Sequence, residues 1–256
     1  MFSKLFGRNK TDKEPQLPVQ AVASPWAFVA ADIHSHFLPG IDDGAKTIED
    51  SLELITAMIS MGYKKIVTTP HVMIDYYPNT PATINAALDK VKEALAANNI
   101  DIPVSAAAEY YIDETFIELL DREPLLTIQG NQVLVECSMM YEPPMLFDVI
   151  HRMHKAGYLP VIAHPERYLF FHRQFDKYQR LRDAGCLLQL NLLAVSGYYG
   201  KNIKAVADDL LSQRLYDYCG SDMHHSRHAA ALQALAASPD YAKLAAYSFR
   251  NASIIE

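Results

Sequence analysis

Apolar stretches of strand-like composition alternate with helical stretches along most of this 256-residue chain. Strands that alternate with helices form parallel sheets with right-handed crossovers, and a series of such units without an interrupting linker is typical of a closed (β/α) barrel. The sequence therefore predicts an α/β fold, with a doubly wound open sheet as the structural alternative. The segments that carry the seven expected strands span residues 28–44, 65–71, 102–109, 132–137, 158–167, 186–191 and 215–225.

The best-marked helix is expected directly after the first of these segments. Thr47-Ile-Glu-Asp50 has the pattern of a capping box, with aspartate in place of the usual glutamate or glutamine, and Gly62 is positioned to end the helix. Apolar residues recur at helical spacing between these two points. Further helices are expected at residues 83–97, from 113, at 144–156, before Gly185 and at 201–213.

The first segment, residues 28–44, ends in two histidines and an acidic loop. In an extended strand alternate side chains share a face, so His34 and His36 point the same way and can bind one ion together. Asp42 or Asp43 then offers an oxygen ligand nearby. Two histidines at this spacing can also be a polar strand end with satisfied hydrogen bonds, so this segment alone leaves metal binding open.

Histidines and carboxylates also follow several other expected strands. In a (β/α) barrel the carboxyl ends of the strands meet at one face, where active-site residues collect. Imidazole and carboxylate groups without sulfur form the ligand set expected for zinc, manganese or iron. The sequence therefore predicts a metal centre at this face. The residues concerned are His34, His36, His71, Glu109, His164 and Asp222.

Charge and composition limit the possible functions and locations. The formal net charge of −7 indicates no basic surface for nonspecific binding to nucleic acid or to an anionic membrane. The sequence has no run of about 18 apolar residues that could span a membrane, and no signal peptide is recognisable. The three cysteines are widely spaced within or beside apolar runs, which favours a reducing, cytoplasmic compartment.

The expected domain organisation follows from the polarity of the N-terminal region. Residues 7–25 are polar and contain Pro15, Pro18 and Pro25, so we expect residues 1–27 to form a flexible polar leader. Trp26 is expected to fix the end of this leader against the folded part. Residues 28–256 are then expected to form a single barrel domain.

Five groups of residues at the expected strand ends form a recognisable set. They are Asp32-Ile-His-Ser-His36 with Asp42-Asp-Gly44, Thr69-Pro-His71, Ala108-Glu-Tyr-Tyr111, Ile162-Ala-His-Pro-Glu-Arg167 and Ser221-Asp-Met-His224. The set resembles the polymerase-and-histidinol-phosphatase (PHP) superfamily of metal-dependent hydrolases. More narrowly, it is similar to bacterial manganese-dependent protein-tyrosine phosphatases associated with capsule and exopolysaccharide synthesis. Each group is a weak signal alone, whereas the set spans almost the whole chain beyond the leader.

The resemblance implies a distorted (β/α)7 TIM-like barrel of the PHP fold, with two or three divalent metal ions at the carboxyl ends of its strands. Manganese is the expected metal, with iron, zinc and magnesium as alternatives. Glu109 would bridge two ions, and a hydroxide shared by them would be the nucleophile. By this resemblance one ion is held by His34, His36, Glu109 and Asp222, a second by His71, His164 and Glu109, and a third by Asp43 and His224.

Phosphate binding also requires cationic donors, and the planar fork of arginine matches a phosphoryl group. The family pattern implies this role for Arg167 and for Arg227, although the loop before Arg227 is shorter than in relatives. Either arginine could instead be a surface charge. With Asp43 and His224, the two arginines form the expected catalytic set. The remaining histidines are expected at the surface: His151, His154, His172, His225 and His228.

The expected activity is that of a metal-dependent phosphomonoester hydrolase. The resemblance implies a protein-tyrosine phosphatase that acts on phosphotyrosine of a bacterial tyrosine kinase in capsule or exopolysaccharide regulation. The thiol mechanism of other tyrosine phosphatases needs an arginine six residues after the cysteine, and Cys137, Cys186 and Cys219 all lack one. The alternatives are a small-molecule phosphatase such as a histidinol-phosphatase, a metal-dependent nuclease, and a non-catalytic metal-bound scaffold for the kinase.

Overall fold

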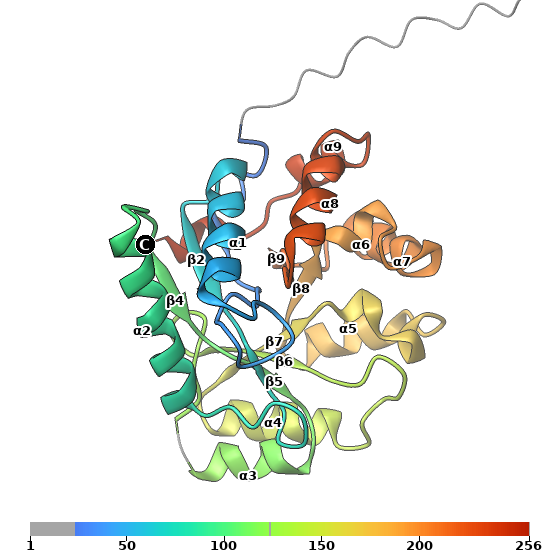
Figure 1. The fold of residues 1–256 in the computed structure, drawn as a ribbon. Coiled ribbons are helices and arrows are strands. Elements are labelled where there is room, and N and C mark those ends of the chain that lie inside the picture. Colours follow the sequence, from blue (N-terminus) through green and yellow to red (C-terminus); the bar gives the residue numbers. More distant parts are fainter. Residues whose placement is uncertain (1–23, 123, 256) are drawn as a thin grey trace, which may run out of the picture.

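The computed structural model describes residues 24–122 and 124–255, and helices surround a central group of strands (Figure 1). All pairings between these strands are parallel, as the sequence predicts for an α/β fold. One sheet has the order β1 (Ala31–Asp32), β2 (Lys65–Thr68) and β4 (Val104–Ala106). The other has the order β3 (His71–Val72), β5 (Glu109–Tyr111), β6 (Gln132–Glu136), β7 (Leu159–Ala163), β8 (Leu187–Asn191) and β9 (Tyr218–Gly220).

The strands correspond to the seven expected segments. Two of these segments, the second and the third along the chain, are each divided into two strands. Thr69 and Pro70 separate β2 from β3, and proline cannot donate a ladder hydrogen bond. Backbone hydrogen bonds still cross the break, from Ala107 N to Thr68 O (2.9 Å) and from Glu109 N to Pro70 O (3.0 Å). The strand pairing defines two sheets, and their closure into one barrel stays a prediction.

Helices connect most of the strands, in the alternating order that the sequence predicts. In the described part of the chain they are α1 (Ile48–Met61), α2 (Pro81–Ala97), α3 (Glu114–Arg122), α4 (Leu146–Lys155), α5 (Asp176–Asp183), α6 (Leu192–Ser196), α7 (Lys201–Ser212), α8 (Ser226–Ala236) and α9 (Tyr241–Ala245). Short 3-10 helices span Pro165–Arg167, Leu169–Phe171 and Asn251–Ile254. The expected helices are confirmed, whereas α6, α8 and α9 are additional. None of the described helices has the length and apolar character needed to cross a membrane.

Helix α1 forms as its capping signals predict. Thr47 Oγ1 accepts a hydrogen bond from Asp50 N (3.2 Å), and Asp50 Oδ2 accepts one from Thr47 N (3.1 Å). Gly62 ends the helix with φ of 101°, a left-handed conformation that glycine adopts without steric cost. The buried face includes Leu54 and Ile55, which helps to pack α1 between α2 and α8.

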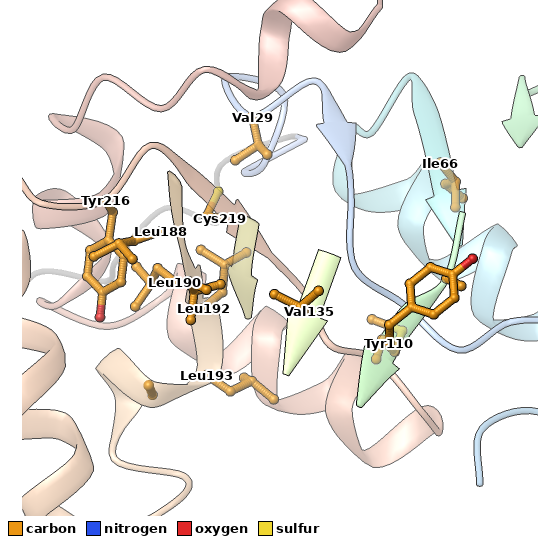
Figure 2. Packing of buried hydrophobic residues seen from close by; sticks show 14 of the residues in the cluster. Val29, Ile66, Tyr110, Val135, Leu188, Leu190, Leu192, Leu193, Tyr216 and Cys219 are labelled. Atoms are coloured by element: carbon orange, nitrogen blue, oxygen red, sulfur yellow. The ribbon is translucent and has the colours of Figure 1, made fainter. Parts of the chain in front are cut away.

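The alternation of side chains along the strands separates two apolar clusters. Successive residues of a strand point to opposite faces, and in β6 Val133 and Val135 lie in the larger cluster, whereas Leu134 lies in the smaller one. The larger cluster, which includes Leu188 and Leu190 of β8, packs strands against helices (Figure 2). The smaller cluster contains side chains of β1, β2, β6, β7, β8 and β9. It therefore fills the space that these strands share.

The N-terminal boundary of the folded part lies before the expected residue 28. Trp26 is fully buried, and its backbone N–H donates to Met61 O (2.9 Å). Its ring meets the ring of Tyr241 edge-on, with 5.5 Å between the centroids. Trp26 thus packs against the folded part, as the sequence predicts. Residues 1–23 of the predicted leader lie outside the described residues.

Asn251, near the C-terminus, connects β1 to β9. Its Nδ2 donates to Ala31 O (2.9 Å) and Cys219 O (2.7 Å), and its Oδ1 accepts from Cys219 N (3.0 Å). The side chain is fully buried, so these backbone groups have no access to water at this point. The C-terminal segment therefore holds the first and last strands together.

We predict that Asn251→Ala lowers the free energy of unfolding by about 2–5 kcal/mol, because an unpartnered buried polar group costs roughly 1–3 kcal/mol. The control is Asn98→Ala, which removes a hydrogen bond from Asn98 Nδ2 to Ala94 O (2.9 Å) at the exposed end of α2. This control should change stability by less than about 1 kcal/mol. Urea denaturation measures both, and equal effects of the two substitutions would contradict the role of Asn251.

A candidate metal centre at the carboxyl ends of the strands

Glu109, the first residue of β5, lies at the centre of a buried group of histidines. Its Oε2 lies 3.1 Å from His34 Nε2, 3.4 Å from His36 Nε2 and 3.3 Å from His71 Nδ1. Its Oε1 lies 3.1 Å from His164 Nε2. The structure therefore brings together side chains that follow β1, β2 and β7, as the sequence predicts.

Asp222, which follows β9, forms a second carboxylate contact on the same histidines. Its Oδ1 lies 3.3 Å from His34 Nε2 and 3.5 Å from His36 Nε2. Its Oδ2 accepts hydrogen bonds from Arg167 Nη1 (2.7 Å) and Asn191 Nδ2 (2.7 Å). One oxygen of Asp222 is thus directed to the histidines while the other is held by neighbouring donors.

Asp43 and His224 extend the group towards solvent. Asp43 Oδ1 lies 3.4 Å from His224 Nε2 and 3.5 Å from His71 Nε2, and the Asp43 side chain is 51% exposed. The ring of His224 stacks on that of His36, with 3.9 Å between the centroids. The group is therefore open on the side of Asp43 and closed around Glu109.

Glu136 also belongs to the group, although it is not among the residues predicted from the sequence. Its Oε1 lies 3.1 Å from His71 Nδ1, and its Oε2 lies 3.8 Å from His164 Nε2. Glu136 is the last residue of β6, and it follows the smaller-cluster residue Leu134 at the two-residue spacing of one strand face. An acidic residue at the end of an expected strand was the signal that could have identified it.

The donor atoms of these side chains lie close enough to hold metal ions. Imidazole nitrogens and carboxylate oxygens without sulfur suit manganese, iron or zinc. Four sets, each with its donor atoms within 4.8 Å of one another, are His36, Asp43, His71 and His224; His34, His36 and Asp222; His34, Glu109 and His164; and His71, Glu109 and Glu136.

One orphaned nitrogen supports a metal ion at this place. His36 Nε2 is buried and forms no hydrogen bond with any residue that the structure describes, although it faces the carboxylates of Glu109 and Asp222. A buried polar atom without a partner costs free energy, and a bound cation would remove that cost. The donor set and the orphaned nitrogen therefore both fit a divalent metal ion.

The electrostatics of the group also favour a cation. Burial raises the pKa of the Glu109 carboxyl, but His34 and His71 together hold that pKa well below its usual value. Burial lowers the pKa of His34, but Glu109 and Asp222 raise it to about 9. The carboxylates thus stay ionised and stabilise positive charge between them, which is also what a divalent cation requires.

A second layer of side chains orients the histidines. Gln189 Oε1 lies 2.8 Å from His34 Nδ1, and Asp42 Oδ2 lies 2.8 Å from His36 Nδ1. In both rings Nε2 is left to face the centre, which is the usual arrangement around metal-binding histidines. The structure thereby gives different positions to Asp42 and Asp43, which the sequence leaves as alternative ligands. Asp42 supports His36, whereas Asp43 itself faces the centre.

Two of the candidate ligands have left-handed backbone conformations, and one glycine lies too close to a neighbouring residue to be replaced by a residue with a Cβ. His164 has φ of 32° and Asp222 has φ of 48°, in the left-handed region that costs a residue with a Cβ roughly 1–3 kcal/mol. A Cβ added to Gly44 would lie 2.1 Å from His36 O, so only glycine permits this loop to close on His36. The fold therefore holds these strand ends in positions that a free chain would avoid.

The two predicted phosphate-binding arginines have different surroundings. Arg167 donates to Asp222, and its guanidinium carbon lies 4.5 Å from the centre of the Tyr199 ring. Arg227 lies in the first turn of α8 and is exposed, and no ion pair or hydrogen bond joins it to the candidate centre in the described part of the chain. The predicted loop around Arg227 is instead the start of α8, and Arg227 is exposed there.

One histidine expected at the surface is buried. His228 is 8% exposed, and its Nδ1 accepts a hydrogen bond from His224 N (3.2 Å). The prediction of a surface position was wrong, because α8 begins directly after the ligand segment and its first turn folds back onto it. His228 therefore helps to fix the position of His224.

The three cysteines are buried and free, and none belongs to the candidate centre. Burial raises the pKa of the Cys137 and Cys186 thiols to about 12 and that of Cys219 well above its usual value. A thiolate is the reactive form of cysteine, so these thiols are unsuited to act as nucleophiles near neutral pH.

Comparison with known proteins agrees with this geometry. The chain is 30% identical over 195 residues to the tyrosine-protein phosphatase YwqE of Bacillus subtilis, covering 76% of this chain and 77% of that protein. It is 28% identical over 200 residues to the tyrosine-protein phosphatase CpsB of Streptococcus pneumoniae, covering 76% and 82%. It is 27% identical over 194 residues to the putative tyrosine-protein phosphatase CapC of Staphylococcus aureus, covering 75% and 76%.

A solved structure and a family model extend the comparison. The structure, from a study of YwqE from Bacillus subtilis and CpsB from Streptococcus pneumoniae as metal-dependent tyrosine phosphatases, superimposes with a TM-score of 0.72 at 28% identity. The match covers 83% of this chain and 90% of that one. The model of the family described as "Capsular polysaccharide synthesis, CpsB/CapC" matches residues 30–238. Because that match covers most of the sequence, this chain belongs to the CpsB/CapC family.

Proposed function

We propose that this protein is a metal-dependent phosphatase that hydrolyses phosphotyrosine in proteins. The observation that carries the proposal is the convergence of four histidines on the buried carboxylate of Glu109, with Arg167 beside the same group. Its relatives are named tyrosine-protein phosphatases, which favours phosphotyrosine over a small-molecule phosphate ester.

Two or three divalent ions would be held by the four sets of donor atoms, and manganese is the metal that we propose. When bound, these ions would supply Lewis acidity towards the phosphoryl oxygens and towards water. Glu109 belongs to two of the sets, so it is the residue best suited to bridge two ions. Asp43 and His224 belong to the set on the exposed side, where a third ion would bind.

The side chains around the centre prepare the phosphate site. Arg167 is held by Asp222 on one side and by the Tyr199 ring on the other, with 23% of its side chain exposed. Its remaining N–H groups can donate to the peripheral phosphoryl oxygens, where charge collects in the transition state. Asn191 Nδ2 donates a hydrogen bond to Asp222 Oδ2 (2.7 Å), which helps to hold in place the carboxylate that pairs with Arg167.

We also propose that the two sheets together form the distorted (β/α)7 barrel that the sequence predicts. A parallel bridge between Ser35 and Met223 supports this, with hydrogen bonds from Asp222 N to His34 O (2.8 Å) and from His36 N to Met223 O (3.0 Å). These contacts link the segment after β1 to the segment after β9, and they bring the two ligand segments together.

The family assignment extends the proposal to a biological setting. Because the family model describes capsular polysaccharide synthesis, we propose a bacterial tyrosine kinase of that process as the phosphoprotein substrate. Free buried cysteines are typical of a reducing compartment, which supports a cytoplasmic location. The direct experiment compares hydrolysis of a phosphotyrosine peptide with that of histidinol phosphate. Faster turnover of histidinol phosphate would favour the small-molecule alternative, and turnover of neither would favour the scaffold.

We predict that activity depends on metal and not on thiols. Chelation should abolish hydrolysis of an aryl phosphate, and added manganese should restore it, because the donor set is complete and the thiols are buried. Replacing Cys137, Cys186 and Cys219 together by alanine should leave turnover per folded molecule within a few-fold of wild type. Loss of turnover in a folded, metal-loaded triple variant would contradict the metal mechanism.

We predict that Glu109→Gln removes more than one metal ion per chain, because Glu109 belongs to two donor sets. The amide keeps the shape but lacks the charge that offsets two cations, so turnover should fall by several orders of magnitude. Glu93→Gln is the control, since Glu93 is exposed on α2. Elemental analysis of the purified variants measures the metal, and full occupancy in Glu109→Gln would exclude the bridging role.

We predict that Arg167→Lys lowers kcat/KM for a phosphotyrosine peptide by roughly ten- to a thousandfold, about 1.4–4 kcal/mol, as for the loss of one positioned transition-state donor. Lysine keeps the charge beside Asp222 but loses the planar fork. Metal content and melting temperature should stay near wild type. Arg227→Lys is the matched control and should be nearly silent, because Arg227 is exposed on α8. An equal effect at both positions would refute the role of Arg167.

A further inference from the structure

Large exposed apolar side chains gather on the face that carries the candidate centre. Six of the seven in the described part of the chain lie in segments that follow the carboxyl ends of strands. The seventh, Ile255, follows the C-terminal 3-10 helix, which packs against β1. We name these six residues the apolar rim: Ile74 and Tyr76 after β3, Met140 and Tyr141 after β6, Leu169 after β7, and Tyr198 after β8 and α6.

The apolar rim is continuous with the candidate centre on two sides. On one side the ring of Tyr77 stacks on His71, with 5.4 Å between the centroids, and Met73 N donates to Tyr77 O (3.0 Å). These contacts fix the turn that carries Ile74 and Tyr76. On the other side Tyr198 packs edge-on against Tyr199, with 5.1 Å between the centroids, and Tyr199 lies against Arg167.

The part of the rim after β6 is also held in place. Ser138 Oγ accepts hydrogen bonds from Met140 N (3.2 Å) and Tyr141 N (3.3 Å). Leu169 N donates to Met139 O (2.9 Å), which joins the segments after β6 and β7. Because these hydrogen bonds already order the backbone, binding a partner would cost little further backbone freedom, which favours binding.

A cavity opens beside Ile74. It has a volume of about 200 Å³, and its wall includes Ile74, Val72, Tyr111, Phe116 and Leu119. Val72 directly follows His71, so its side chain points to the opposite face of β3, and Tyr111 lies two residues after Glu109 in β5. The cavity wall therefore includes residues within two positions of two candidate ligands. The wall also includes polar side chains such as Thr115, Glu118 and Arg122. The size and the apolar part of the cavity suit a single large apolar side chain.

We propose that the apolar rim binds the polypeptide on either side of the phosphotyrosine, with an apolar side chain of that polypeptide entering the cavity beside Ile74. This proposal rests on the proposed function, and it identifies how a protein substrate is distinguished from a small phosphate ester. A small ester would occupy the centre and leave the rim uncovered. Exposed apolar side chains, tyrosine in particular, are enriched at protein-binding sites, and three of the six rim residues are tyrosines.

The test compares three substrates: a phosphotyrosyl peptide with leucine on both sides of the phosphotyrosine, the same peptide with serine at those positions, and free phosphotyrosine. The variants are the double substitutions Met140→Ser with Tyr141→Ser and Ile74→Ser with Tyr76→Ser. Ile255→Ser is the matched control, because Ile255 is an exposed apolar residue outside the rim.

The wild type and the control should favour the leucine peptide over the serine peptide by about tenfold or more in kcat/KM, through a lower KM. Each double variant should lose most of this preference, with hydrolysis of free phosphotyrosine within about twofold of wild type. An unchanged preference in both double variants would overturn the rim proposal alone. Failure of the wild type to hydrolyse any of the three substrates would overturn the proposed function as well.

A second copy of this chain is the competing occupant of the rim. Light scattering of the same variants distinguishes self-association through the rim from binding of a substrate polypeptide. A double variant that shifts the protein from oligomer to monomer while keeping the wild-type preference for the leucine peptide would assign the rim to self-association and overturn the proposal. An unchanged oligomeric state with a lost preference would support it.

Discussion

The candidate metal centre is built around the carboxylate of Glu109, which is completely buried and yet ionised. Burial alone would favour the neutral acid, and four histidine rings within 3.4 Å of its oxygens reverse that preference. Asp222 and Glu136 add further negative charge to the same histidines. These carboxylates favour positive charge between them, and this explains why a divalent cation fits the group.

The fold supplies that charge arrangement from distant parts of the chain. β5 contributes Glu109, and the segments after β1, β2, β7 and β9 contribute its partners. His164 and Asp222 reach the centre through left-handed backbone conformations, so part of the packing energy of the surrounding strands offsets local strain. Gln189 and Asp42 then orient His34 and His36. The positions of the candidate ligands therefore depend on the arrangement of all these strands.

Much of this arrangement could be predicted from the sequence. The periodicity of apolar residues shows where strands end, and the histidines and carboxylates that follow these ends are the candidate ligands. The positions of His34, His71 and Glu109 follow from this rule. The rule applies equally to Glu136, the last residue of β6, which was not among the predicted ligands. The surroundings of Arg227 and His228 could not be predicted, since both depend on where α8 begins, and no strong capping signal marks that point.

Anomalous X-ray diffraction from crystals of the manganese-loaded protein would show whether Glu109 binds metal ions. We expect at least two manganese peaks, both within coordination distance of Glu109, with imidazole nitrogens of His34, His36, His71 and His164 around them. Peaks confined to surface carboxylates, with Glu109 bound only by hydrogen bonds to the histidines, would contradict the claim that this buried group is a metal centre.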